Sequence, residues 1–301
     1  MQHISANGIT LSYDSFGEVQ AEAFLLVSGL GTQMIRWNDA FCEDLASHGF
    51  RVIRFDNRDA GGSTHFTQSP APNFAALAQA VAAHEKPTAP YTLHDMAADA
   101  IGLLDALGIK RAHIVGRSMG GMIAQLLASL YPHRVLTLTA MMSSTGNPTL
   151  PSAAPDVMAL LTQPSPSLAE DTLGFLNHRL QFAKRIASPG YPFDETTQRT
   201  IILEEANLAN DPTAFGRQLA AIVATGDLRP VLARIVAPTL VIHGTDDPLI
   251  PLACGKDIAA HIRHATFIPI DGMGHDIPLE LEHLIIQALV RTAHPHSSRM
   301  H

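Results

Sequence analysis

The chain has 301 residues, of which 46% are hydrophobic and 16% charged, and its formal net charge is −8 with a pI near 6.0. This acidic balance, without any basic stripe, argues against nucleic acid or an anionic membrane surface as a partner. The first residues lack the charged and apolar segments of a signal peptide, and no apolar run approaches the length of about 18 residues that spans a membrane, so we expect a cytoplasmic protein with no membrane partner.

The first third of the chain alternates between strand-like and helix-like patterns. Asn7-Gly8 is typical of a hairpin turn, which predicts two antiparallel strands within residues 4–16. Thr92 and Asp95 have the spacing of a capping box at a helix start. The alanine-rich segment 73–90 contains helix breakers and allows no firm assignment. Apolar patterns predict strands at 24–27 and 51–55 and helices at 37–47 and 92–107.

The chain is organised around a strand, a sharp turn and a helix. The apolar run 113–115 stops at Gly116-x-Ser118-x-Gly120, and an apolar pattern of helical period follows at once. Glycines that flank such a turn relieve the crowding of the backbone and leave the serine hydroxyl exposed. The backbone amide of Met119 points toward the same space from a helix N-terminus. The turn therefore predicts a nucleophile and one oxyanion donor from adjacent residues.

A Gly-x-Ser-x-Gly pattern alone is weak evidence, because short patterns of common residues arise by chance. The alternative interpretation is a glycine-rich turn between a strand and a helix, with Ser118 as a helix cap. The strand before the motif and the helix after it are the context that a nucleophilic serine requires, and they favour the nucleophile.

The alternation pauses in the middle of the chain. Residues 136–141 predict another buried strand, and this region is typical of a mostly parallel sheet with helices on both faces. From residue 145 to about 228 several prolines interrupt the sequence and no strand pattern occurs. Asp211-Pro212 predicts a helix start within this segment. We interpret the segment as a helical insertion over the sheet; further crossover helices of the same sheet are the alternative.

Strand and helix patterns resume near the C-terminus. They predict strands at 239–243 and 265–270, helices at 252–261 and 278–293, and a polar, frayed tail at 294–301. We therefore expect an α/β protein with a core domain of residues 1–144 and 229–301. A helical cap, or lid, of residues 145–228 follows its sixth strand.

A serine nucleophile needs a base, and the base needs a third group that holds it in one tautomer. Among the 16 histidines, His275 is placed in a glycine-bracketed loop directly after a late apolar strand. His113 and His243 lie within predicted strands and are expected to be packed there. An exposed loop histidine is the alternative reading of His275.

The acid of such a triad is expected at the end of another strand. Asp246 and Asp247 follow the strand 239–243, and Pro248 biases Asp247 toward an extended backbone that fixes its direction. We prefer Asp247 and interpret Asp246 as a solvated turn residue. The end of the strand 136–141 offers serines but no carboxylate.

The second oxyanion donor is expected in the loop after the strand 24–27. The amide of Leu30, between Gly29 and Gly31, is the best candidate, and a plain turn is the alternative. Cys42 and Cys254 lie far apart without metal-type spacing, so we interpret them as buried free thiols, with a disulfide as the alternative. We expect neither a metal nor a cofactor.

Four motifs lie in or directly after predicted strands: Asp56-x-Arg58-Asp59-x-Gly61-x-Ser63, Gly116-x-Ser118-Met119-Gly120, Pro238-Thr-Leu-Val-Ile with Asp247-Pro248, and Gly272-Met-Gly-His275. With these motifs the chain resembles the α/β-hydrolase superfamily over nearly its whole length, and more narrowly the esterase branch that includes aclacinomycin methylesterase. The resemblance implies Ser118 as nucleophile, His275 as base, Asp247 as acid, and the amides of Leu30 and Met119 as the oxyanion hole.

Two residues depart from the pattern of the superfamily. Ser28 stands where many relatives have a histidine before the glycine, which leaves the backbone donor in place but changes the floor of the pocket. Arg117 replaces an apolar residue or a histidine that is common after the first glycine of the serine motif, and the sequence does not indicate its partner.

The expected function is a cofactor-free serine carboxylesterase that acts through an acyl-enzyme. A serine in place of an aspartate nucleophile argues against dehalogenase and epoxide hydrolase chemistry. Lactonase, thioesterase, carbon–carbon hydrolase and acyltransferase activities would use the same triad and stay open, as does, more remotely, a non-catalytic receptor. The cap is apolar with few fixed charges, so we expect a small-molecule ester with a hydrophobic acyl or alcohol group. The sequence does not indicate an oligomeric state.

Overall fold

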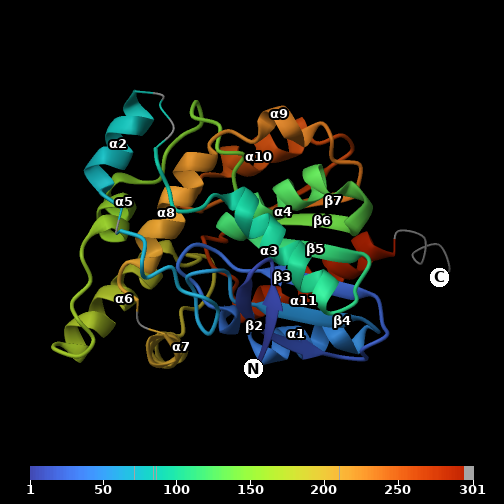
Figure 1. The fold of residues 1–301 in the computed structure, drawn as a ribbon, viewed down its shortest axis with the longest axis horizontal. Coiled ribbons are helices and arrows are strands. Elements are labelled where there is room, and N and C mark those ends of the chain that lie inside the picture. Colours follow the sequence, from blue (N-terminus) through green and yellow to red (C-terminus); the bar gives the residue numbers. More distant parts are fainter. Residues whose placement is uncertain (71, 84, 86, 210, 295–301) are drawn as a thin grey trace.

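The structure of the protein is a computed structural model that describes residues 1–70, 72–83, 85, 87–209 and 211–294. Most of the predicted polar tail, residues 295–301, lies outside the described residues. Within the described part, eight strands form one sheet in the order β1-β2-β4-β3-β5-β6-β7-β8, with helices packed around it (Figure 1).

The strands confirm the predicted alternation. The hairpin of β1 and β2 turns at Asn7 and Gly8, which both have positive φ angles, and β2 continues antiparallel beside β4. From β4 onward all neighbouring strands are parallel. The bounds are β1 (Gln2–Ala6), β2 (Ile9–Phe16), β3 (Ala23–Val27), β4 (Arg51–Phe55), β5 (Ala112–Arg117), β6 (Val135–Met141), β7 (Thr239–Gly244) and β8 (Thr266–Ile270).

The helices that connect the strands begin with α1 (Asp39–Ser47), α2 (Phe74–Ala82), α3 (Leu93–Ala106) and α4 (Met119–Leu130), with short 3-10 turns η1 (Met34–Arg36) and η2 (Pro132–Arg134). Later come α5 (Pro155–Thr162), α6 (Thr172–Ile186), α7 (Glu195–Leu208), α8 (Ala214–Thr225), α9 (Arg229–Leu232), α10 (Leu252–His261) and α11 (Leu279–Ala293). Every helix among the described residues is too short or too polar to span a membrane.

The sheet is buried on both faces, which explains why its central strands read as continuous apolar runs. In β3, Leu25 and Val27 join one hydrophobic cluster with α3, α4 and α10, whereas Phe24 and Leu26 join a second cluster with α1 and α11. Successive side chains of a strand point to opposite faces, so a strand between two helical layers must be apolar at every position.

Between β6 and β7 the described residues form α5 to α9 and no strand. Figure 1 shows α5 to α8 gathered with α2 at one end of the molecule, beside the sheet and not stacked on its faces. The predicted fold class, a mostly parallel sheet with a helical insertion after the sixth strand, is confirmed. The bounds of a separate cap domain at 145–228 stay a prediction.

Two helices begin later than the sequence predicts. The helix expected from Pro212 begins at Ala214, because the carboxylate of Asp211 accepts hydrogen bonds from the backbone and hydroxyl of Thr213 at 2.9 and 2.7 Å. The helix expected from Trp37 begins at Asp39, where Asn38 caps it.

Candidate active site

Ser118 occupies the tight turn between β5 and α4. Its φ and ψ angles are 55° and −126°, a backbone conformation that side chains other than glycine rarely adopt. A Cβ atom on Gly116 would lie 2.0 Å from the carbonyl oxygen of Gly120, and a Cβ on Gly120 would lie 2.2 Å from the carbonyl oxygen of Val27. Both glycines are therefore required by close backbone approach, as the motif predicts.

The structure brings Ser118, His275 and Asp247 together from the ends of β5, β8 and β7. His275 Nε2 lies 3.0 Å from Ser118 Oγ, and His275 Nδ1 lies 2.7 Å from Asp247 Oδ2. A carboxylate can only accept, so the network assigns the proton to Nδ1 and leaves Nε2 to accept from the serine hydroxyl. The histidine can thus take the serine proton without first changing tautomer.

Asp247 is held in place by the backbone that follows it. Its Oδ1 atom accepts hydrogen bonds from the amides of Leu249 and Ile250 at 2.9 and 2.8 Å, and its side chain is 0% exposed. The second oxygen is left for His275, whose side chain is 7% exposed. Asp246 lies beside it and is exposed, as expected of a turn residue.

The loop that carries His275 is bound by hydrogen bonds to the last residue of α6 and to the segment that follows this helix. The backbone N–H of His275 donates to the carbonyl of Ile186 at 2.7 Å, and that of Gly274 donates to Ser188 Oγ at 2.8 Å. The carboxylate of Asp276 accepts from the backbone amide of Ser188 at 2.9 Å and from its hydroxyl, and burial raises the pKa of Asp276. Sequence reasoning missed Ser188 and Asp276; the position of Asp276 next to His275 was the only available signal.

The predicted oxyanion loop lies against the serine. A Cβ atom on Gly29 would lie 3.1 Å from Ser118 Cβ, so the loop after β3 passes directly over the turn. The amides of Leu30 and Met119 donate no hydrogen bond to any other described residue. Both donors therefore remain free for an incoming group.

This loop is held by a side chain that the sequence did not single out. Gln218 on α8 accepts from the backbone N–H of Gly31 at 2.8 Å and donates to the carbonyl of Arg58 at 2.8 Å. On the other side, Asn57 Nδ2 donates to the carbonyl of Ser28 at 3.0 Å. The loop after β3 is thus held by hydrogen bonds on two sides, from α8 in the insertion and from the loop after β4.

The remaining predicted residues lie outside the site or support it. His113 and His243 are buried in β5 and β7, as predicted; His113 contacts Thr137 and Glu22, and His243 contacts the carbonyl of Ile250. Cys42 and Cys254 are buried free thiols.

One other cluster has the residue types of a metal site. Asp59, His65 and Asp211 place three potential ligand atoms within 4.8 Å of one another. Arg217 on α8, however, donates to both carboxylates, with distances of 2.6 and 2.9 Å to Asp59. The guanidinium already supplies the positive charge that these acids require, so the cluster is explained as a buried link between α8 and the loop after β4.

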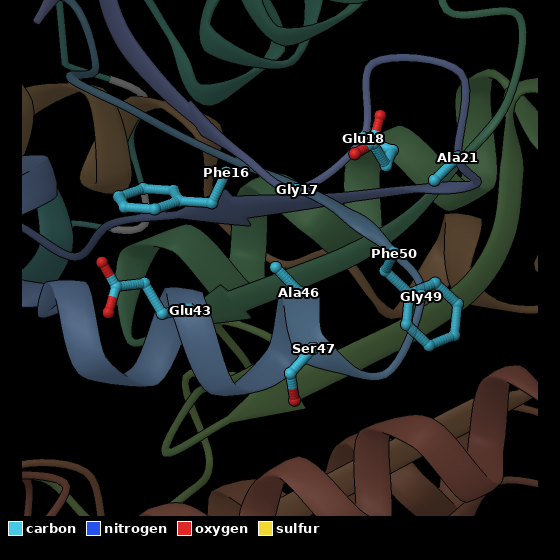
Figure 2. Close-up of a pocket in the computed structure, with 9 residues that line it drawn as sticks. All are labelled: Phe16, Gly17, Glu18, Ala21, Glu43, Ala46, Ser47, Gly49 and Phe50. Atoms are coloured by element: carbon cyan, nitrogen blue, oxygen red, sulfur yellow. The ribbon is translucent and has the colours of Figure 1, made fainter.

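A surface hollow of about 700 Å³ lies elsewhere, where β2 ends beside α1 (Figure 2). Its lining includes Glu18 and Glu43 together with Phe16 and Phe50, all of which Figure 2 labels. Its lining includes neither a nucleophile paired with a base nor a basic side chain. We therefore assign the chemistry to the cluster at Ser118.

Residues 22–280 match the family model described as alpha/beta hydrolase fold. The chain belongs to this family. The match includes the serine turn, both strand ends that carry Asp247 and His275, and the insertion between β6 and β7.

Similar proteins cover most of the length of the chain. A rhodomycin D methylesterase of Streptomyces sp. (strain C5) is 30% identical, with 95% of each chain covered. A 3-oxoadipate enol-lactonase of Acinetobacter baylyi is 28% identical, with 87% of this chain and 85% of the relative covered. The crystal structure of an enol-lactonase from Burkholderia xenovorans LB400 has the same fold, with a TM-score of 0.72 at 23% identity, and covers 97% of this chain and 99% of that one.

Proposed function

We propose that the protein is a serine esterase that hydrolyses carboxylic esters of small molecules. The observation that carries this proposal is the continuous hydrogen-bonded chain from Asp247 through His275 to Ser118 Oγ, with distances of 2.7 and 3.0 Å. In the proposal Ser118 is the nucleophile, His275 the general base and Asp247 the group that orients the imidazole.

The proposed reaction has two halves. Ser118 Oγ attacks the ester carbonyl while His275 Nε2 takes its proton, and the amides of Leu30 and Met119 stabilise the oxyanion, each contributing about 3 kcal/mol. The C–O bond to the alcohol then breaks, and His275 gives its proton to the leaving oxygen. In the second half His275 takes a proton from water, which attacks the acyl-enzyme, and the acid leaves as Ser118 regains its proton.

Two of the relatives support an ester as the substrate. The relative from Streptomyces is a methylesterase by name, and the relative from Acinetobacter is a lactonase by name, a lactone being an internal ester. We propose a substrate with a largely hydrophobic acyl or alcohol part. Lactone opening is the second candidate, because the enol-lactonase relative aligns with most of this chain.

The decisive experiment compares Ser118→Ala with a matched serine variant in the release of 4-nitrophenol from a short-chain ester. We expect Ser118→Ala to lower kcat by about 10⁵-fold with folding intact, because it removes the nucleophile. Ser129→Ala is the control: this serine lies buried on α4, and within the described part of the chain its hydroxyl bonds only the carbonyl of Leu126. Wild-type turnover by Ser118→Ala would refute the proposal.

A covalent probe provides an independent check. A fluorophosphonate reacts with an activated serine, so we expect one adduct on Ser118, located by mass spectrometry of the digested protein. The adduct should be absent from both Ser118→Ala and His275→Ala, because the serine is inert without its base.

A further inference from the structure

Arg117 is the last residue of β5 and lies directly before Ser118. Its guanidinium lies 5.1 Å from the centre of the Trp37 ring, and its Nη1 atom donates to the carbonyl oxygen of Arg36 at 3.3 Å. An arginine side chain offers several further N–H donors. Within the described residues, none of these reaches a carboxylate.

The acidic groups around Arg117 are already engaged. Glu205 on α7 binds Arg36 through both carboxylate oxygens, at 2.9 and 2.7 Å. Asp276 is bound by the backbone and hydroxyl of Ser188. Arg179 on α6 also lies within the electrostatic range of Glu205, and Arg117 lies within the range of both Glu205 and Asp276. In this cluster three guanidinium groups therefore face two carboxylates.

The guanidinium group of Arg117 is largely surrounded by protein, although the residue keeps some solvent exposure. Burial lowers the pKa of Arg117 to about 10, and repulsion by Arg36 adds to the effect. The preceding residues of β5, Ala112–Gly116, are buried, whereas Arg117 and Ser118 are both partly exposed. A cation in such a place is costly unless an anion compensates for it. Arg117 and Ser118 are adjacent in the chain, and both keep some contact with solvent.

We propose that Arg117 binds a carboxylate group of the substrate. The planar guanidinium matches the two oxygens of a carboxylate, and the Trp37 ring fixes the cation from one side. The substrate class is then an ester that carries a free carboxylic acid in addition to the bond that is cleaved. This inference rests on the proposed esterase function and specifies its substrate.

The test uses pairs of esters that differ only in the acid. One series places it in the acyl part: mono-4-nitrophenyl esters of dicarboxylic acids, compared with 4-nitrophenyl esters of monocarboxylic acids of equal length. The other series places it in the alcohol part: 4-acetoxybenzoate, compared with 4-methylphenyl acetate. We expect the wild type to have a lower KM for the acidic member in at least one series.

The variants are Arg117→Met and Arg117→Lys, with Arg111→Met as control. Arg111 lies just before β5, at the opposite end of the strand from Ser118, and is exposed, so its replacement removes the same charge away from the serine. We expect Arg117→Met to lower kcat/KM for the preferred acidic ester about tenfold more than for its neutral partner, mainly through KM. Arg117→Lys should retain part of the preference, and Arg111→Met all of it.

The outcomes separate the two proposals. Equal losses for acidic and neutral esters in Arg117→Met would assign Arg117 a purely structural role and overturn the inference. A wild type that prefers the neutral ester in both series would overturn it as well, while the esterase proposal would stand. Full activity of Ser118→Ala on every ester would instead refute the esterase proposal itself.

Discussion

Gln218 on α8 accepts a hydrogen bond from the backbone N–H of Gly31 at 2.8 Å, although the two residues are 187 positions apart in the chain. Gly31 follows Leu30, the proposed oxyanion donor, and Gln218 is 0% exposed. A residue of the insertion thus fixes the loop that carries this proposed donor.

Replacing Gln218 by methionine removes this support and leaves the Gly31 amide unsatisfied. We expect kcat to fall by about tenfold or more with a smaller change in KM, because the loop acts on the oxyanion and not on the bound ester. The affinity for a boronic acid, which mimics the tetrahedral intermediate, should fall in parallel. An unchanged kcat would show that the loop holds its position without Gln218.

Replacing Asp247 by asparagine tests the proposed orienting role. An asparagine side chain can present its amide to His275 and favour the wrong tautomer, so we expect kcat to fall by about 10⁴-fold with KM little changed. Asp246→Asn serves as the matched control, because this neighbour is exposed and its carboxylate accepts from Thr245 and the backbone of Gly272 and not from His275. Similar losses in both variants would contradict the assignment of Asp247.

The close approach at the serine turn predicts a large effect of a single methyl group. Gly120→Ala would place a Cβ atom 2.2 Å from the carbonyl oxygen of Val27, which is backbone and cannot move aside. We expect the free energy of unfolding to fall by at least about 3 kcal/mol, measured by urea denaturation. Gly108→Ala has open space around the Cβ atom and only a positive φ, so its cost should stay near 1–2 kcal/mol. Equal costs would contradict the steric explanation.

The buried link between α8 and the loop after β4 predicts a pH dependence of stability. Burial alone would raise the pKa of Asp211, but hydrogen bonds from Thr213 and Arg217 lower it to about 2 from its usual value of 3.8. A lowered pKa in the folded state stabilises the fold above the unfolded value, and this contribution disappears as the pH falls through the folded value. The difference in unfolding free energy between wild type and Asp211→Asn should therefore be constant above about pH 5 and shrink between about pH 4 and pH 2. Parallel stability curves down to pH 2 would contradict it.

The two thiols should be unreactive in the folded protein. Burial raises the pKa of Cys42 to about 12 and also raises the pKa of Cys254, and only a thiolate reacts with a disulfide reagent. With Ellman's reagent at pH 8 we expect slow reaction of the native protein and two thiols per chain after unfolding. Cys42→Ser should give one thiol after unfolding. Rapid reaction of the native wild type would show that a thiol is accessible.

Much of the fold is predictable because its signals are local. The Asn7-Gly8 turn, the Thr92–Asp95 capping box and the apolar strands each act within a few residues of the chain. The nearness of Ser118, Asp247 and His275 was also expected, since the carboxyl ends of parallel strands share one edge of a sheet. The order of the parallel strands therefore brings together residues that are far apart in the sequence.

Most of what could not be predicted in the site depends on contacts between distant segments. Gln218 and Arg217 are ordinary polar residues of a helix in the sequence, and their partners in the loops after β3 and β4 lie about 160 or more positions away. The start of α8 shifted because the carboxylate of Asp211 is engaged by Thr213 and Arg217. The segment 73–90 has many alanines but few of the signals that place helix ends; the structure forms α2 there.

The contacts of α8 bear on any attempt to graft the insertion of a relative onto this scaffold. Although α8 belongs to the inserted segment by position, its Gln218 forms hydrogen bonds with Gly31 and Arg58. Its Arg217 binds Asp59 in the same way. A chimera that exchanged residues 145–228 alone would lose these hydrogen bonds and leave the buried Asp59 without the guanidinium of Arg217. The helix and the two loops that it contacts therefore form one structural unit, and a graft has to include all three.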